Sequence, residues 1–253
     1  MSVERPILVS VMQFEDALKS GVMHVFDVID VAARVGADGV ELRRETWPGW
    51  QTELSAARQR AEAKGLLITY ATHATLFSTD AATLRGDIDA AAALGSPIVR
   101  FFPGQIPAAD DAAGWAAGQA VAGYAAGKGV VIALENYART PGGALAEIQT
   151  ALGRIPSLMT NFDMGNYSLH SQDVPAAVAA LADRIVASHL KDQTGVPGDP
   201  PTVLGGGVLP LDAIFDALDG LPQRVIYCLE FRGGADAVAR IEQSLIYLHK
   251  RQT

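Results

Sequence analysis

The stretch Val130-Val131-Ile132-Ala133-Leu134-Glu135 is an apolar run that ends in a carboxylate, and the next short run, Met159-Thr160-Asn161-Phe162-Asp163, ends in the same way. Short runs rich in β-branched residues are typical of strands buried in a parallel sheet. The longer segment between them carries alanines and apolar residues at helical spacing. This order of strand, helix and strand is the repeating unit of an α/β fold.

The same unit recurs along the whole chain. The pattern predicts strands over residues 7–11, 39–42, 66–71, 98–102, 130–135, 159–163, 185–190 and 225–231. It predicts helices over residues 23–35, 52–64, 81–94, 111–128, 143–152, 175–181, 211–218 and 236–249. Eight such units in 253 residues predict an α/β fold of the (β/α)₈ TIM-barrel type, with residues 1–253 forming one domain.

The amino-acid composition and net charge exclude several classes of protein. The chain has 20 Lys and Arg against 28 Asp and Glu, a net charge of −8, with 49% hydrophobic residues. These values exclude a disordered or coiled-coil polypeptide, and the acidic balance argues against a nucleic-acid partner. The N-terminus has no basic region before a long apolar segment, and no run of about 18 apolar residues occurs. We therefore expect a cytoplasmic protein that has no membrane partner.

Four consecutive predicted strands end in polar side chains of the kinds that bind metal ions. These are Glu135, Asp163, His189 and Glu230, and each is separated from the next by about one unit of strand and helix. Active sites of TIM barrels lie at the carboxyl ends of the strands, so neighbouring strands should bring these side chains together. The alternative is that each one faces solvent or caps the following helix.

Three carboxylates and one imidazole in one pocket would repel each other and lose hydration unless a cation neutralised them. A site rich in carboxylates with one His suits Mn²⁺, Mg²⁺ or Co²⁺, and Zn²⁺ is also compatible. The sequence therefore predicts one divalent metal ion and does not specify which.

Other strand ends supply candidate substrate-binding residues. His73 follows the third predicted strand, where it could bond a substrate hydroxyl group. Glu41 and Arg43 end the second strand, and Glu41 could orient a hydroxyl group or pair with an arginine. Alternation along the fourth strand predicts that Arg100 points inward. Its guanidinium suits a carboxylate or phosphate of a substrate, or a bridge to Glu135.

The runs Leu134-Glu135-Asn136, Phe162-Asp163-Met164-Gly165-Asn166, His189-Leu190-Lys191-Asp192 and Leu229-Glu230 resemble motifs of the xylose isomerase-like TIM barrels of the sugar phosphate isomerase/epimerase family. The resemblance covers nearly the whole chain. It implies that Glu135, Asp163, His189 and Glu230 are the metal ligands. It also implies that Glu135 and Glu230 act as acid and base on opposite faces of a small sugar-like substrate in carbohydrate metabolism.

This chain differs from the ketose 3-epimerases of that family at two positions that bear on the reaction. Ketose 3-epimerases carry a His three residues after the aspartate ligand, where this chain has Asn166, and the arginine they carry after the histidine ligand has no counterpart before Arg224. The motifs of this chain, with Asn166 after the aspartate and the pattern His-x-Lys-Asp, look more like those of the inosose dehydratase and generic sugar phosphate isomerase branches of the family. There Lys191 would hold a substrate oxygen or assist proton transfer, and Asn166 would contact the substrate. Lys191 could equally pair with Asp192.

Three functions are consistent with these residues. The first is a metal-dependent isomerase or epimerase that acts on a sugar or related polyhydroxy carbonyl compound through an enediolate. The second is a metal-dependent dehydratase of the inosose or dehydroshikimate type, and the third is a non-catalytic sugar-binding barrel. Small residues in the segment 111–128 would allow close approach of another element, either from the same chain or from a second copy in a homo-oligomer.

Overall fold

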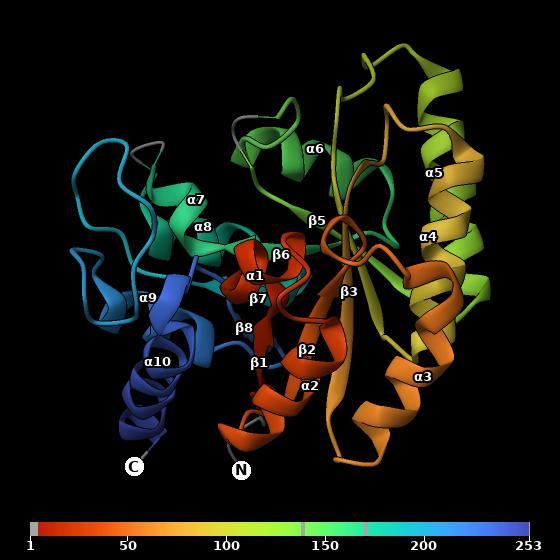
Figure 1. Cartoon of the computed structure of the whole chain (residues 1–253). Coiled ribbons are helices and arrows are strands. Elements are labelled where there is room, and N and C mark those ends of the chain that lie inside the picture. The colour runs from red at the N-terminus through yellow and green to blue at the C-terminus, as the bar shows by residue number, and fades with distance from the viewer. Residues whose placement is uncertain (1–4, 138–139, 170–171, 253) are drawn as a thin grey trace.

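The eight strands form a closed parallel barrel in chain order, with the first strand paired to the last (Figure 1). The computed structural model describes residues 5–137, 140–169 and 172–252. The strands are β1 (Ile7–Ser10), β2 (Gly39–Arg43), β3 (Leu67–Thr75), β4 (Ile98–Phe102), β5 (Val131–Glu135), β6 (Met159–Asp163), β7 (Ile185–Leu190) and β8 (Ile226–Leu229). The TIM-barrel prediction is therefore confirmed.

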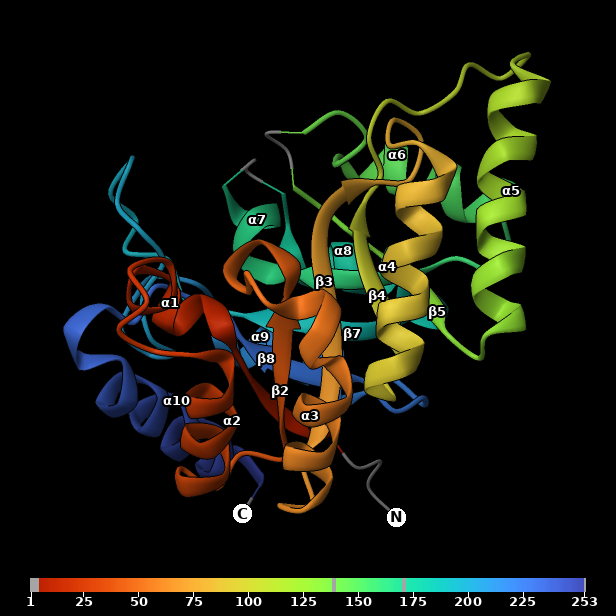
Figure 2. The same cartoon turned by 45° about the vertical axis from the view of Figure 1, so that its right-hand side comes forward.

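Helices surround the barrel on the outside, and Figure 2 shows α3 and α4 beside β3, with α5 next to α4. The α-helices are α1 (Glu15–Lys19), α2 (Val25–Arg34), α3 (Trp50–Glu62), α4 (Ala81–Leu94), α5 (Ala112–Gly127), α6 (Leu145–Arg154), α7 (Met164–Ser168), α8 (Val174–Ala180), α9 (Leu211–Asp219) and α10 (Ala237–Gln252). Short 3₁₀ helices are η1 (Val11–Phe14), η2 (Arg44–Thr46), η3 (Ala182–Arg184) and η4 (Gly234–Asp236). Among the described residues, no helix is both long and apolar enough to cross a membrane.

The interior of the barrel changes from apolar to polar along the strands. Its apolar layer consists of Leu8, Ile98, Ala133, Ala187, Ile226 and Cys228. Successive residues of a strand alternate between the two faces, so the residue two positions later also points inward. Five of these six residues are followed in this way by a polar residue, namely Ser10, Arg100, Glu135, His189 and Glu230. The alternation therefore places a polar layer at the carboxyl end of the barrel, above a small apolar layer.

The structure corrects three details of the prediction. Strand β3 continues to Thr75, so His73 lies within the strand and not after it. Two short helices, α1 and α7, were not predicted; η1 lies between β1 and α1, whereas α7 follows β6 directly. Helix α7 begins there because Asp163 caps it, with Oδ1 accepting a hydrogen bond from the Asn166 backbone N–H at 2.8 Å.

Candidate metal centre and active site

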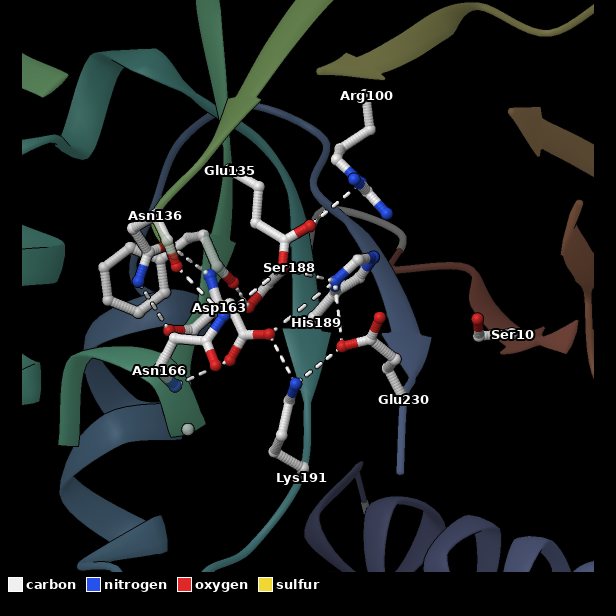
Figure 3. A network of polar contacts seen from close by, with 12 residues as sticks. Ser10, Arg100, Glu135, Asn136, Asp163, Asn166, Ser188, His189, Lys191 and Glu230 are labelled. Atoms are coloured by element: carbon white, nitrogen blue, oxygen red, sulfur yellow. Dashed lines mark hydrogen bonds and ion pairs between the residues drawn. The ribbon is translucent and has the colours of Figure 1, made fainter. Parts of the chain in front are cut away.

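The four predicted ligand residues converge at the carboxyl end of the barrel (Figure 3). Each offers one ligand atom, and these atoms all lie within 4.8 Å of one another. The shared space lies around Nδ1 of His189, which is 3.6 Å from Glu135 Oε1, 3.7 Å from Asp163 Oδ2 and 3.3 Å from Glu230 Oε2. All four side chains are buried. The strand ends thus bring together the residues that the sequence analysis selected.

One of the converging atoms, His189 Nδ1, has no hydrogen-bond partner among the described residues although it is fully buried. The other nitrogen of the imidazole, Nε2, lies 2.8 Å from Glu41 Oε2. Buried polar atoms without a partner are rare in proteins and need an explanation. A divalent cation held by one imidazole nitrogen and three carboxylates provides one, so the residues present fit a metal ion.

Lys191 belongs to the same cluster. Its Nζ lies 2.5 Å from Asp163 Oδ2 and 2.6 Å from Glu230 Oε2. The neighbouring Asp192 instead accepts hydrogen bonds from the backbone N–H groups of Gly207 and Leu209, at 3.0 and 3.1 Å. The described contacts of Lys191 therefore favour a place in the site over the simple pair with Asp192.

Two buried arginines support the cluster from the first half of the barrel. Arg100 Nε lies 2.8 Å from Glu135 Oε2, which is the bridge that the sequence analysis gave as an alternative to substrate binding. Arg43 Nε donates to Glu41 Oε1 at 3.1 Å, and Arg43 Nη2 contacts Glu230 Oε1. Each of these carboxylates thus has a fixed positive charge beside it, which reduces the free energy needed to keep it ionised in the barrel interior.

Burial and neighbouring charges act in opposite directions on the ionisable groups. Burial raises the pKa of Glu230, but the positive charges of His189, Lys191 and Arg43 outweigh it and hold the pKa well below its ordinary value. For Asp163, burial outweighs the charge of Lys191 and the pKa stays raised. Burial lowers the pKa of His189, and nearby carboxylates, Glu230 first, raise it well above the ordinary value. Without a metal ion, the imidazolium and the ammonium therefore carry positive charge into the cluster.

Two asparagines hold the ligands in place. Asn136 Oδ1 accepts from the Asp163 backbone N–H at 2.8 Å, and Asn136 Nδ2 donates to the Asp163 carbonyl at 2.9 Å. Asn166 Nδ2 donates to Glu135 Oε1 at 3.3 Å and to the Asn136 carbonyl at 3.0 Å. The sequence analysis gave Asn136 no role, although this residue stands in the motif Leu134-Glu135-Asn136, directly after a strand-end carboxylate. The role of Asn166 in substrate binding stays a prediction.

His73 is an exposed residue near the carboxyl end of β3, the end of the barrel that carries the predicted ligands. Its ring centroid is 6.0 Å from that of Phe102, which in turn lies 5.5 Å from the ring of Tyr137. Burial lowers the pKa of His73, so the ring favours the neutral form, which can donate and accept hydrogen bonds. Its contact with a substrate stays a prediction.

Comparisons with known proteins relate this barrel to one family. The profile of the xylose isomerase-like TIM barrels matches residues 29–251. Similar solved structures include D-allulose 3-epimerase from Methylomonas sp. in complex with D-allulose, with a TM-score of 0.80, 19% identity and 99% of each chain covered. L-ribulose 3-epimerase has a TM-score of 0.77 and 16% identity, with 97% of this chain and 94% of that chain covered.

A dehydratase is similar to the same degree. The probable 3-DHS dehydratase AsbF from Bacillus anthracis has a TM-score of 0.77 and 17% identity, with 96% of this chain and 98% of that chain covered. None of the curated protein sequences matches this chain significantly. At these identities the likeness establishes the shared fold, and a shared fold can host different reactions.

Proposed function

Because this chain belongs to the xylose isomerase-like TIM barrel family, we propose that it is a divalent-metal-dependent isomerase or epimerase. The substrate class is a sugar or a related polyhydroxy carbonyl compound, as the names of the similar epimerases suggest. One observation carries the proposal. Four buried ligand atoms from β5, β6, β7 and the residue after β8 lie within 4.8 Å of one another, at the end of the barrel where TIM-barrel enzymes have their active sites.

In this proposal Glu135, Asp163, His189 and Glu230 hold one Mn²⁺, Mg²⁺, Co²⁺ or Zn²⁺ ion. When bound, the ion supplies Lewis-acid stabilisation of the negative charge that develops on a substrate oxygen. The buried charges of Arg43 and Arg100 keep two of the carboxylates ionised, which a cation site requires. The apolar layer below the cluster keeps water away from its lower side.

Glu135 and Glu230 are the proposed acid and base. They come from strands on either side of β7 and lie on opposite sides of His189 (Figure 3). An ionised carboxylate removes the proton from the carbon next to the substrate carbonyl, which leaves an enediolate. Return of the proton by the same group to the former carbonyl carbon, with transfer of the hydroxyl proton from one oxygen to the other, gives isomerisation. Delivery by the second carboxylate to the opposite face of the same carbon gives epimerisation.

A dehydratase is the second candidate, and the position of Lys191 favours it. The ammonium lies 2.6 Å from Glu230 Oε2, so it could donate a proton to a departing hydroxyl group while Glu230 removes the proton from carbon. The likeness to a probable 3-DHS dehydratase supports this reading of the same scaffold. A non-catalytic sugar-binding barrel is the third hypothesis.

The remaining assignments extend the proposal. Glu41, Arg43, Arg100, His73 and Asn166 are the predicted substrate contacts, and two of these, Arg43 and Arg100, already pair with carboxylates of the cluster. A cytoplasmic location and a homo-oligomer stay predictions.

The first test measures metal content per chain by elemental analysis after identical metal loading. We expect about one divalent ion in the unmodified protein and none in Asp163→Ala. Asp87→Asn is the matched control, since Asp87 is a fully buried carboxylate that bonds Arg44 outside the cluster. This control should retain the ion. A protein that takes up no ion under saturating conditions overturns the metal-dependent reading.

The second test distinguishes the reactions. The loaded protein is incubated in deuterated water with a panel of ketoses and inososes. Deuterium next to the carbonyl together with an isomer or epimer supports the first proposal. An absorbing enone or diketone without an epimer supports the dehydratase. No turnover, with ligands that still raise the melting temperature, supports the non-catalytic barrel.

A further inference from the structure

Glu41 makes a direct contact with one of the predicted metal ligands. Its Oε2 lies 2.8 Å from His189 Nε2, and both side chains are buried within the barrel. Glu41 lies in β2, which packs between β1 and β3, whereas His189 lies in β7. The contact therefore crosses the barrel interior and is independent of the hydrogen bonds between neighbouring strands.

This contact decides which nitrogen of the imidazole is available to a cation. A neutral imidazole carries one proton, and the nitrogen without it holds the lone pair that binds a metal. A carboxylate beside Nε2 retains the proton there. The lone pair is then on Nδ1, which is the atom that faces Glu135, Asp163 and Glu230 at 3.3 to 3.7 Å.

Glu41 is itself held in a single orientation. Its other oxygen, Oε1, accepts hydrogen bonds from Ser10 Oγ at 3.0 Å and from Arg43 Nε at 3.1 Å. Both carboxylate oxygens are therefore engaged by groups of this chain, on β1, β2 and β7. A side chain held in this way is better suited to orient His189 than to follow a substrate hydroxyl group.

Arg43 extends the same support to a second ligand, because its guanidinium also contacts Glu230. Strand β2 thus touches the ligands of both β7 and β8 through two adjacent inward positions. The ligands come from the second half of the barrel, and the groups that orient two of them come from the first.

We propose that Glu41 is a positioning residue that fixes the proton of His189 on Nε2, and so presents Nδ1 to a divalent metal ion. This inference rests on the proposed metal centre and gives Glu41 a different role from substrate binding. Carboxylates that accept the second N–H of a metal-binding His raise its basicity and fix its ring, and their loss typically weakens metal binding about 10- to 100-fold.

The test uses Glu41→Gln, which keeps the shape of the side chain and removes its charge. The zinc dissociation constant is measured by competition with a chelator, and the Nε2–H signal of His189 is followed by ¹H–¹⁵N NMR of the zinc-loaded protein. We expect zinc binding to weaken about 10- to 100-fold. We also expect the Nε2–H signal, far downfield beside a carboxylate, to move upfield or to be lost through exchange.

Asp87→Asn serves as the matched control, because it neutralises another buried carboxylate that pairs with an arginine away from His189. It should leave both readouts unchanged. Ser10→Ala is a milder second variant that removes one hydrogen bond to Glu41, and it should shift both readouts in the same direction by a smaller amount. It keeps the inference testable if Glu41→Gln does not fold.

The outcomes separate this inference from the proposed function. If the unmodified protein binds no zinc, the proposed metal centre fails. If it binds zinc and Glu41→Gln binds equally well, the positioning role is wrong and the metal centre stands. Weaker binding with an unmoved Nε2–H signal would show a general structural effect and would also overturn the role of Glu41.

Discussion

Lys191 Nζ lies 2.5 Å from Asp163 Oδ2, the same oxygen atom that faces His189 Nδ1 at 3.7 Å. The ammonium thus occupies the edge of the space that a metal ion would share. An ammonium and a divalent cation that share one carboxylate oxygen repel each other. A metal ion and the ammonium cannot both use this oxygen without a shift of the lysine.

Replacement of the lysine should therefore strengthen metal binding. In Lys191→Met we expect the dissociation constant of the metal to fall about tenfold, which corresponds to about 1.4 kcal/mol of relieved repulsion. We expect turnover to fall by about 10² or more if the ammonium donates a proton. Chelator competition measures the first quantity and initial rates measure the second.

Lys128→Met is the matched control, since Lys128 pairs with the half-exposed Asp89 on the surface. Neither quantity should change in this variant. Weaker metal binding in Lys191→Met would show that the lysine organises the ligands more than it competes with the ion.

The buried pair of Arg100 and Glu135 should stabilise the fold strongly once it is formed. Both side chains are less than 5% exposed. Removal of one partner from a buried ion pair typically destabilises by about 3–5 kcal/mol, so Arg100→Met should lower the free energy of unfolding by this amount. The double variant Arg100→Met/Glu135→Gln should recover part of the loss. Urea unfolding of the four proteins of this cycle measures the coupling.

The exposed pair of Arg58 and Glu62 provides the comparison for that cycle. Its coupling should be below about 1 kcal/mol. A coupling energy of Arg100 and Glu135 below about 1 kcal/mol would contradict the prediction that the buried pair stabilises the fold strongly.

Asn136 should contribute to stability through both of its hydrogen bonds. Asn136→Ala removes the side-chain partners of the buried N–H and carbonyl of Asp163, and we expect a loss of about 2–4 kcal/mol in urea unfolding. Asn161→Ala is the control, because Asn161 is equally buried and neither of its amide atoms has a partner. This variant should be less destabilising than Asn136→Ala, and the reverse order would refute the role of Asn136.

Asp87 should make stability depend on pH. Burial raises its pKa to about 6, against the opposing charge of Arg44. The folded state therefore binds this proton more tightly than the unfolded state, so its contribution to stability is fully present below the unfolded pKa of 3.8 and is lost as pH rises to about 6. The expected change is about 1.4 kcal/mol for each unit of pKa difference.

The measurement compares the free energy of unfolding of the unmodified protein and of Asp87→Asn between pH 4 and 7. As pH rises, the free energy of unfolding of the unmodified protein should fall relative to that of Asp87→Asn, and the difference should then become constant. A difference that is constant over this range would be inconsistent with a raised pKa.

The barrel and its four converging side chains were predictable because their signals are local. Alternation within a strand tells which residues point inward, and a polar residue at the end of an apolar run marks the edge of a barrel. Glu135 and Asp163 show both signals at once. The prediction of His189 needed only its position within the next apolar run.

The partners of these residues were less predictable, because they depend on how distant strands are placed. Lys191 pairs with Asp163 and Glu230, although Asp192 is adjacent in sequence. Strand β3 continues past His73 because its last residue, Thr75, still pairs with β4 across a shift in register. Such shifts follow from the closure of the whole barrel and leave no mark in a local pattern.

The contacts across the barrel join residues from the first and the last parts of the chain, so the site is complete only when the whole barrel has formed. Arg43 contacts Glu230, which lies 187 residues later, and Glu41 contacts His189, which lies 148 residues later. A chain emerging from the ribosome therefore lacks Glu230, which is both a predicted ligand and the partner of Arg43, until its last strand has been made and has paired with its first. Binding of a metal ion by all four of these residues would therefore require the closed barrel.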